Sequence, residues 1–345
     1  MKKILIINTG GTFSSVESDS GLAPGISGEQ IIDAIHPGKQ ICQLEMEDYC
    51  SLDSANITPE DWVEISRRIS RAVNVYDGVV VIHGTDVMAY TAAMLSFLLL
   101  HVPLPVVLTG SQLPLFAPLT DAVDNCQCAI QMALSGKNGV YVVFNKKIML
   151  GCRTSKVRTV SFDAFESINY PQVGGFNAFG MQLNEDALPK QTGEFAFDPA
   201  YSDRIAVLKV FPGLNPDIFS YLYEKGYEGV FIEGFGLGGV PFMKNNLLKE
   251  IRKASEKGMA ILVGSQCRYE GSNLNIYETG QRVKACGGIP VYDMTQEAVV
   301  AKLMWCLGRT KDRNEIQRYF YTNLTNEVTL EMRECKILVS ENGIL

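Results

Sequence analysis

The sequence is poor in histidine and tryptophan, and it has no long hydrophobic run and no block of like charges. It contains three histidines and two tryptophans in 345 residues. The histidines, at positions 36, 83 and 101, form neither an HxH nor an HExxH pattern, which argues against a metal site. A net charge of −7 without a basic cluster argues against nucleic acid or an anionic membrane surface as a partner.

The cysteines are not spaced as a disulfide framework or a zinc site. None of the nine belongs to a CxxC pair. The apolar residues that follow Lys2 and Lys3 end at Ile7, which is too short for the apolar core of a secretory signal. The later apolar run Ala92–Leu100 is too short to span a membrane. Free thiols without a leader segment predict a cytoplasmic protein whose cysteines fill its core.

Strand and helix signals alternate along the chain, which is typical of a doubly wound α/β fold. Short β-branched runs predict buried parallel strands. These runs span residues 3–7, 78–82, 105–110, 139–144, 205–211, 229–232 and 259–263. Helices are predicted over about residues 59–73, 87–100, 121–134, 215–226, 244–258 and 295–307.

The length of the chain predicts two domains, because 345 residues exceed one comfortable hydrophobic core. A stretch near residues 184–199 mixes proline, glycine, threonine and acids without periodicity. We therefore expect an N-terminal catalytic domain over residues 1–185 with a larger, mostly parallel, flavodoxin-like sheet. A linker over residues 186–202 and a smaller C-terminal α/β domain over residues 203–345 follow it.

Hydroxyl-bearing and charged residues gather where several predicted strands end. Four such segments are residues 9–12, 54–56, 83–86 and 109–112, and a fifth is residues 153–156. Because the carboxyl ends of parallel strands open onto the functional edge of an α/β sheet, Thr12 and Thr85 are expected to face one pocket. No GK[ST] pattern follows Thr12, which excludes a phosphate-binding P-loop. The pattern suits nucleophilic hydrolysis.

Longer segments match one known family in the same order along nearly the whole chain. They are Thr9–Thr12, His83–Thr91, Thr109–Pro114 and Asp293–Thr295, joined by Thr58–Trp62, Phe162–Phe165 and Ser265–Cys267. The first four resemble the signatures of bacterial-type L-asparaginases. The last three resemble the intracellular, type I branch of that family.

The resemblance implies a hydrolase that converts asparagine and water to aspartate and ammonia without a cofactor or a metal. It implies that Thr12 attacks the side-chain amide carbon and forms an acyl-enzyme. It also implies that Thr85 forms a second triad with Asp86 and Lys156, and that Ser54 and Asp86 hold the substrate's α-carboxylate and α-amino groups. The expected substrate-binding residues are Gly11, Ser54, Ala55, Thr85, Asp86 and Ser111.

The chemistry of these residue types agrees with those roles. A threonine hydroxyl is a weak nucleophile until a base removes its proton. A lysine accepts a proton only when neutral, and a nearby carboxylate such as Asp86 favours its charged form. We therefore expect Asp86 to orient Lys156, to polarise Thr85 and to be shared with the substrate's ammonium group.

The sequence departs from the family pattern in the loop after the proposed nucleophile. In many members this loop carries a tyrosine that hydrogen-bonds to the nucleophile. Residues 14–24 contain no tyrosine, and Leu22 stands at the matching place. Some intracellular relatives also lack this tyrosine. Tyr277 is our candidate substitute, with a neighbouring subunit as one source, and the alternative interpretation of Tyr277 is a half-buried core aromatic.

A second departure predicts weak or no cooperativity toward asparagine. Some type I enzymes bind asparagine at an allosteric site through an arginine in the segment that matches residues 232–236. This chain has Glu233 there, and its charge repels a carboxylate. Cys267 is retained, but a cysteine alone makes no amino-acid site. A velocity curve against asparagine concentration with a Hill coefficient clearly above one would contradict this prediction.

Two other functions stay open beside the asparaginase. The first is the asparaginase-like subunit of a tRNA-dependent amidotransferase, which normally carries an additional N-terminal domain; the position of Thr12 near the start argues against it. The second is a non-catalytic amino-acid-binding regulator, which the joint presence of Thr12, Thr85, Asp86 and Lys156 disfavours. Family resemblance suggests a homodimer or homotetramer. Preference between asparagine and glutamine is open, since one methylene changes binding by only about 1–3 kcal/mol.

Overall fold

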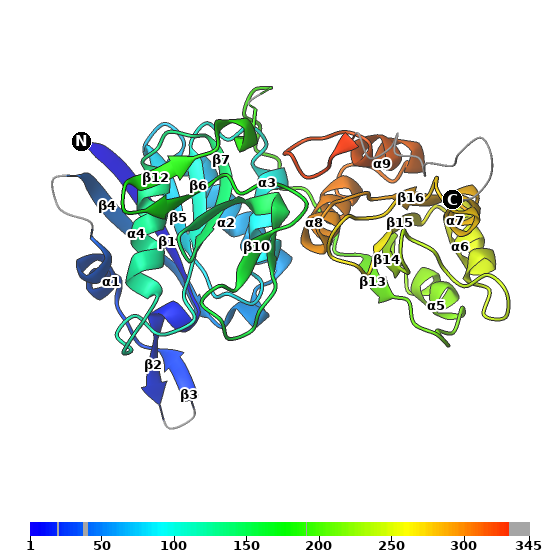
Figure 1. Cartoon of the computed structure of the whole chain (residues 1–345), viewed down its shortest axis with the longest axis horizontal. Coiled ribbons are helices and arrows are strands. Elements are labelled where there is room, and N and C mark those ends of the chain that lie inside the picture. The colour runs from blue at the N-terminus through cyan, green and yellow to red at the C-terminus, as the bar shows by residue number, and fades with distance from the viewer. Residues whose placement is uncertain (19–20, 37–40, 191, 331–345) are drawn as a thin grey trace, which may run out of the picture. The chain divides into compact units, whose positions relative to one another are not determined.

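The structure is a computed structural model that describes residues 1–18, 21–36, 41–190 and 192–330 (Figure 1). Leu22 belongs to a segment whose side chains are not described. The chain divides into two compact units, Met1–Pro199 and Ala200–Leu345. Each unit has its own main sheet.

The N-terminal unit is built on an eight-stranded mixed sheet of order β12-β11-β8-β7-β6-β5-β1-β4. Its strands are β1 (Lys2–Gly10), β4 (Cys42–Leu52), β5 (Gly78–Ile82), β6 (Pro105–Thr109), β7 (Gly139–Phe144), β8 (Lys147–Leu150), β11 (Gly174–Asn177) and β12 (Gly180–Leu183). The first five are parallel and the last three pair antiparallel. In chain order the parallel strands are arranged 2-1-3-4-5, the flavodoxin order. The expected α/β class with a mostly parallel N-terminal sheet is confirmed.

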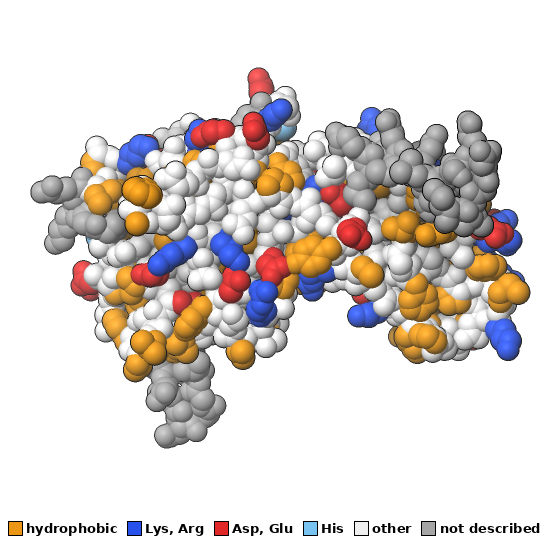
Figure 2. Space-filling model, in the orientation of Figure 1, with side chains coloured by type: hydrophobic (Ala, Val, Ile, Leu, Met, Phe, Trp, Pro, Cys, Tyr) orange, Lys and Arg blue, Asp and Glu red, His pale blue; other side chains and the backbone are white. Residues whose placement is uncertain are grey.

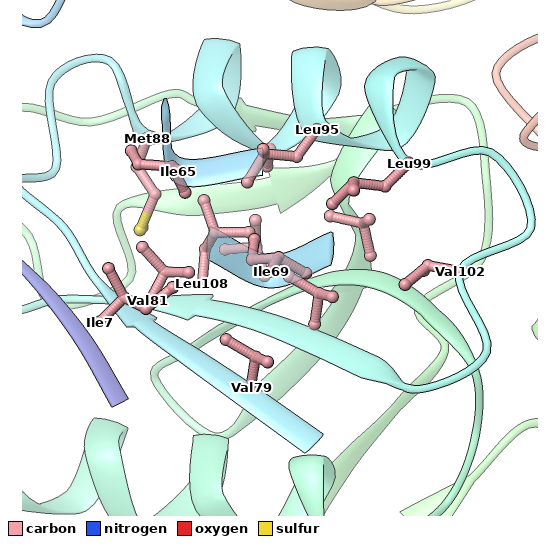
Figure 3. Packing of buried hydrophobic residues seen from close by; sticks show 14 of the residues in the cluster. Ile7, Ile65, Ile69, Val79, Val81, Met88, Leu95, Leu99, Val102 and Leu108 are labelled. Atoms are coloured by element: carbon pink, nitrogen blue, oxygen red, sulfur yellow. The ribbon is translucent and has the colours of Figure 1, made fainter. Parts of the chain in front are cut away.

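Helices cover both faces of this sheet, which is why its central strands are apolar on both sides. The helices are α1 (Gly28–Ile35), α2 (Pro59–Ala72), α3 (Met88–Leu98) and α4 (Ala122–Ala133). On one face, side chains of α2 and α3 such as Ile69 and Leu95 pack against Ile7, Val79 and Val81 (Figure 3). The helix α4 lies on the opposite face of β5, β6 and β7.

Local sequence signals predicted several of these helices correctly. The helix α2 begins where the sequence predicts it, because Thr58 and Asp61 form a capping box and Pro59 occupies its first turn. The helix α3 is buried on nearly all sides. It is therefore apolar all round, and it shows no amphipathic period.

The eleven-residue strand β4 was absent from the sequence prediction. It pairs with β1 at the edge of the sheet. Glu45, Glu47 and Asp48 interrupt its apolar residues, and most of its side chains are partly exposed. An edge strand tolerates charges that a central strand would exclude, so its sequence lacks a clear apolar run. Two short hairpins were also unpredicted: β2 (Ser15–Ser18) with β3 (Gly21–Pro24), and β9 (Thr154–Lys156) with β10 (Phe165–Ser167).

The C-terminal unit contains a smaller, fully parallel sheet of order β13-β14-β15-β16. Its elements are β13 (Ile205–Lys209), α5 (Ile218–Glu224), β14 (Gly229–Gly234), α6 (Leu247–Glu256), β15 (Ala260–Ser265), α7 (Glu278–Ala285), β16 (Gly288–Pro290), α8 (Gln296–Leu307) and α9 (Arg313–Phe320). One face packs against α5, α6 and α7. Side chains of α8, including Leu303 and Leu307, reach the other face at Gly229. This arrangement confirms the predicted second α/β domain.

A buried ion pair lies inside the C-terminal unit. The Lys302 and Glu327 side chains are both fully buried and bonded to each other. Lys302 also donates to the Thr322 carbonyl at 2.8 Å. The Glu327 carboxylate accepts from the Leu324 and Thr325 amides at 3.0 and 2.7 Å. The pair therefore ties the segment after α9 to the middle of α8.

The surface carries charges of both signs. On the face shown in Figure 2, basic and acidic side chains are interspersed, with scattered hydrophobic ones between them. None of the helices in the described part of the chain combines the length and the apolar character needed to cross a membrane.

Candidate active site

The candidate site lies at the carboxyl ends of β1 and β5, where the strand order reverses. In flavodoxin-like sheets this switch point opens a crevice for ligands. Gly10 and Gly11 have φ values of +96° and +76°, in the region that favours glycine. A Cβ on Gly11 would lie 2.5 Å from the Gly84 Cα, so the two strand ends meet backbone to backbone. This close contact brings the following residue of each segment to one place.

A cavity of about 320 Å³ opens at this point. It is lined by Gly11, Thr12, Ser15, Leu52, Asp53, Ser54, Gly84, Thr85, Asp86, Gln112, Lys156 and Thr159. The structure thus brings together Gly11, Thr12, Ser54, Thr85, Asp86 and Lys156 from the sequence prediction. These residues come from segments after β1, β4 and β5 and from β9.

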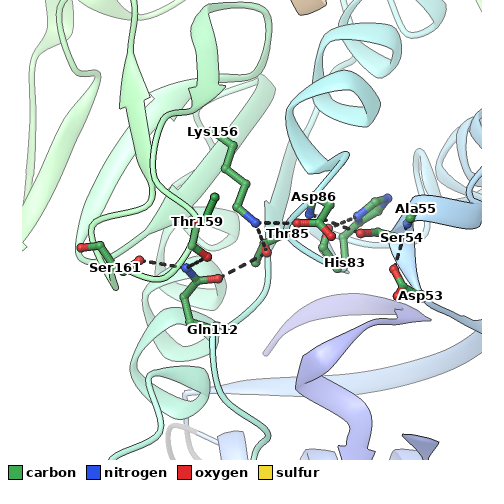
Figure 4. A network of polar contacts seen from close by, with 11 residues as sticks. Asp53, Ser54, Ala55, His83, Thr85, Asp86, Gln112, Lys156, Thr159 and Ser161 are labelled. Carbon is green, nitrogen blue, oxygen red and sulfur yellow. Dashed lines mark hydrogen bonds and ion pairs between the residues drawn. The ribbon is translucent and has the colours of Figure 1, made fainter. Parts of the chain in front are cut away.

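Lys156 joins Thr85 and Asp86 into one polar network (Figure 4). Its Nζ donates to the Thr85 Oγ1 at 2.8 Å and to the Asp86 Oδ1 at 2.7 Å. The Lys156 side chain is only 16% exposed, whereas that of Asp86 is 64% exposed. The carboxylate therefore faces solvent and remains open to a second cation. Within the described residues the Thr12 hydroxyl has no hydrogen-bond partner.

The turn that carries Thr12 is held by a buried asparagine. Asn8 is 4% exposed, and its Nδ2 donates to the Asp48 Oδ1 at 2.9 Å. Its Oδ1 accepts from the Gly10 amide and the Ser14 hydroxyl, both at 3.1 Å. Because these two donors lie on either side of Thr12, Asn8 fixes both ends of the turn. Asn8 directly precedes the predicted segment of residues 9–12, and it was not among the site residues expected from the sequence.

Ser54 and Asp53 also line the cavity, next to Asp86. The Ser54 Oγ accepts from the Asp86 amide at 3.2 Å. Asp53 caps the short turn η2 (Ser54–Asn56) by accepting from the Ala55 amide at 2.9 Å. The Ala55 amide, expected to bind substrate, is thus already bonded, and Ala55 does not line the cavity. Asp53 lines it and was not predicted.

Gln112 is a site residue that the sequence reasoning missed. Ser111 was the residue expected from the same segment. It is buried, donates to the Leu113 carbonyl and does not line the cavity. Gln112 lines the cavity, and its Oε1 accepts from the Thr85 Oγ1 at 3.4 Å. The residue types predicted that the segment after β6 lies at the site, but they did not indicate which of its side chains faces the cavity.

His83 supports the Thr85 segment from inside the protein. It is fully buried, and burial lowers its pKa to about 4. Its Nδ1 lies 2.7 Å from the Gly84 carbonyl, so this nitrogen carries the proton. The neutral Nε2 then accepts from the Thr91 hydroxyl at 2.9 Å, and Thr91 accepts from the Trp62 Nε1 at 2.9 Å.

The buried neutral His83 predicts that the N-terminal unit loses stability in mild acid. The pKa of His83 is depressed in the folded state, so above about pH 6.5 both states are neutral and it contributes nothing. As pH falls toward 4 the unfolded chain takes up a proton first, which costs about 2 kcal/mol between pH 7 and 5. Urea unfolding followed by Trp62 fluorescence in a Trp305→Phe background would measure this. A His83→Gln variant should lose this part of the pH dependence; an unchanged slope would contradict the assignment.

The remaining predicted residues belong to the C-terminal unit. Tyr277 precedes α7, is 55% exposed and lines a groove of that unit, so it is not part of the hydrophobic core. The role of Tyr277 as a substitute tyrosine that assists Thr12 stays a prediction. Glu233 is the last residue but one of β14 and is 7% exposed. Burial raises its pKa, although Lys209 and Arg268 act in the opposite sense. Cys267 is exposed. Among the described residues, no three His, Cys, Asp or Glu side chains cluster as metal ligands.

Comparisons with known proteins find matches to both units of the chain. Residues 3–188 match the family model described as "Asparaginase, N-terminal", and residues 204–320 match "Glutaminase/Asparaginase C-terminal domain". The chain is 38% identical to an L-asparaginase of Thermococcus kodakarensis, over 95% of this chain and 99% of that protein. The solved structure of that thermostable enzyme aligns with a TM-score of 0.90.

Two further similarities bear on function. L-asparaginase I of Vibrio cholerae is 30% identical, with a TM-score of 0.85 over 95% of this chain and 99% of that chain. A subunit of the glutamyl-tRNA(Gln) amidotransferase of Pyrococcus furiosus is 35% identical over 94% of this chain and 76% of that protein. These matches confirm the resemblance inferred from the motifs. The chain belongs to the asparaginase family.

Proposed function

We propose that this protein hydrolyses L-asparagine to L-aspartate and ammonia, with Thr12 as the nucleophile. The observation that carries the proposal is the meeting of Thr12, Thr85, Asp86 and Lys156 in one small polar cavity. Two hydroxyls and a lysine in one cavity supply a nucleophile and a proton acceptor. The similarity to characterised L-asparaginases supports the same activity.

The cavity suits a zwitterionic amino acid. The largely exposed Asp86 carboxylate offers a partner for the α-ammonium group while it stays bonded to Lys156. Ser54, which also lines the cavity, offers its hydroxyl to the α-carboxylate. The side-chain amide then extends toward Thr12 and Thr85. Bound in this way, the substrate would place its reacting carbon between the two threonines.

The reaction would proceed in two steps, formation of an acyl-enzyme and its hydrolysis. The Thr12 Oγ1 bonds to the carboxamide carbon, the C–N bond breaks, and the hydroxyl proton is transferred to the leaving nitrogen as ammonia forms. A water molecule then adds to the resulting ester, returns a proton to the Thr12 oxygen and releases aspartate. A neutral Lys156, acting through Thr85, would carry the proton in each step. No cofactor is required for either step.

An ammonia-release assay tests the proposal directly. The purified protein should release ammonia from asparagine, and Thr12→Ala should abolish the release. Ser51→Ala is a matched control for the loss of a hydroxyl, because Ser51 lies in the exposed end of β4 and does not line the cavity; it should retain full activity. Parallel assays with glutamine would establish which side-chain length is preferred. Full activity in Thr12→Ala would overturn the nucleophile assignment.

The similarity to amidotransferase subunits favours one alternative, in which the same site feeds ammonia to a partner enzyme. Activity of the isolated chain on free asparagine, without a partner or tRNA, would favour the asparaginase. Ammonia release that appears only when a second subunit and tRNA are added would favour the amidotransferase. A non-catalytic regulator would bind asparagine and release no ammonia under either condition.

The proposed assembly is a homodimer or homotetramer in the cytoplasm. Light scattering of the purified protein would measure its mass in solution. If Tyr277 assists Thr12 from a neighbouring subunit, Tyr277→Phe should lower activity without changing that mass. Unchanged activity in Tyr277→Phe would remove Tyr277 from the site.

A further inference from the structure

The Gln112 side chain connects three segments that line the cavity. Its Nε2 donates to the Thr159 carbonyl at 3.2 Å and to the Ser161 carbonyl at 2.9 Å. Its Oε1 accepts from the Thr85 Oγ1 at 3.4 Å. One amide thus joins the loop after β6, the loop after β5 and the segment that follows Lys156 in the chain (Figure 4).

The orientation of this amide is determined by its partners. Carbonyl oxygens only accept hydrogen bonds, so the nitrogen of Gln112 must face Thr159 and Ser161. Both N–H bonds of the amide are then used. The oxygen is left facing Thr85. If the amide were flipped, its oxygen would face the Thr159 and Ser161 carbonyl oxygens, and none of these atoms can donate a hydrogen bond.

The backbone of Gln112 is held just as firmly. Its amide donates to both oxygens of the Asp121 carboxylate at 3.0 and 3.1 Å, and the Leu113 amide donates to the same carboxylate at 3.2 Å. Asn125 of α4 donates to Asp121 at 2.9 Å and to the Gly110 carbonyl at 3.0 Å. The loop that presents Gln112 is therefore fixed to the first turn of α4.

The hydrogen bond to Gln112 determines where the Thr85 proton points. When Lys156 is an ammonium group it can only donate, so the Thr85 oxygen accepts from it. The Thr85 proton must then point elsewhere, and the Gln112 oxygen is its acceptor. Only when Lys156 is neutral can Thr85 turn its proton from Gln112 to Lys156.

We propose that Gln112 is a positioning residue that orients the Thr85 hydroxyl and holds the segment after Lys156 in register with it. The proposal rests on the function proposed above, because it assigns Gln112 to the same reaction. Gln112 acts through Thr85 and Lys156. Its loss would misplace those two groups and leave the proposed nucleophile Thr12 intact.

Two Gln112 variants and a matched control test this role. Gln112→Met keeps the length of the side chain and removes every hydrogen bond that the side chain makes. It should lower kcat for asparagine about 10- to 100-fold, because misplaced groups lose that much rate, with KM changed far less. Gln43→Met makes the same replacement on an exposed residue of β4, at the opposite end of the strands, and should match the wild type.

The split between kcat and KM is a readout that a purely structural role would not give. Gln112→Glu keeps an oxygen toward Thr85, but it replaces the amide nitrogen by an oxygen that faces the Thr159 and Ser161 carbonyls. It should therefore release the segment after Lys156 as Gln112→Met does and lower kcat, with KM changed far less.

Hydrogen exchange separates failure of this proposal from failure of the proposed function. Amides of residues 157–164 should exchange faster in Gln112→Met than in the wild type, and Gln43→Met should show no change. Wild-type kcat together with unchanged exchange in Gln112→Met would overturn the positioning role. A wild-type protein that releases no ammonia would instead overturn the proposed function, and the exchange result would still decide whether Gln112 positions the segment.

Discussion

Replacing Lys156 with methionine is expected to reduce kcat for asparagine by about 10²- to 10⁴-fold, the range that positioned proton transfer contributes. The Lys156 ammonium group is bonded to both Thr85 and Asp86, at 2.8 and 2.7 Å. Methionine fills a similar volume but can neither accept nor donate a proton. A coupled ammonia assay at saturating asparagine would measure the loss.

Companion variants show whether the loss reflects proton transfer. Thr85→Ser keeps the hydroxyl and should retain substantial activity, whereas Thr85→Val keeps the shape and should lose nearly all of it. Lys137→Met removes an exposed lysine that pairs with Glu185 in the same unit, and it should behave as the wild type. Lys156→Met with kcat within threefold of the wild type would remove Lys156 from the mechanism.

Replacing Lys302 with methionine is expected to destabilise the C-terminal unit by about 3–5 kcal/mol, because it leaves a buried carboxylate unpaired. Glu327 is fully buried and bonded to Lys302. Denaturant unfolding followed by Trp305 fluorescence in a Trp62→Phe background would report this unit. Arg318→Met breaks an exposed pair with Glu315 in the same unit and should cost no more than about 1 kcal/mol.

The paired replacement separates a lost charge partner from lost packing. Lys302→Met combined with Glu327→Leu removes both charges, and it should recover much of the stability that Lys302→Met loses. The single and double variants form a double-mutant cycle, in which we expect a large coupling energy between Lys302 and Glu327. Equal losses in the single and double variants would show that packing alone accounts for the effect.

The same pair predicts a loss of stability in strong acid. Burial raises the pKa of Glu327, but Lys302 and the neighbouring donors outweigh it, so the net pKa is lowered. A carboxylate with a lowered folded pKa stabilises the protein above its unfolded pKa, near 4.3. That contribution is lost as pH falls through the folded value. The difference in unfolding free energy between the wild type and Glu327→Gln should therefore shrink below about pH 4.

The central strands and the principal helices were predictable because their signals are local. Buried strands such as β5 and β7 consist of β-branched and apolar runs, and they have the predicted bounds. Strand β4 could not be found in this way. It lies at the edge of the sheet, where Glu45 and Glu47 stay in contact with solvent. Partial exposure along nearly the whole strand left no continuous apolar run to recognise.

The candidate site was predictable as a set of segments and less so as a set of side chains. Thr12 and Thr85 could be expected together because both follow parallel strands next to each other in the sheet. Which side chain of residues 109–112 enters the cavity depends on Asp121, which holds the loop from farther along the chain. The direction of a side chain in a loop depends on such distant anchors, and no local pattern encodes them.

The sequence by itself determined the fold class, the asparaginase family and the strand ends that carry the chemistry, because apolar periodicity and motif order are properties of neighbouring residues. The tertiary structure alone decided the partners of Lys156, the selection of Gln112 over Ser111 and the bonding of the Ala55 amide to Asp53. It also decided that Lys302 and Glu327 meet inside the second unit. These are contacts between atoms brought together by folding, so distance in space rather than position in the chain controls them.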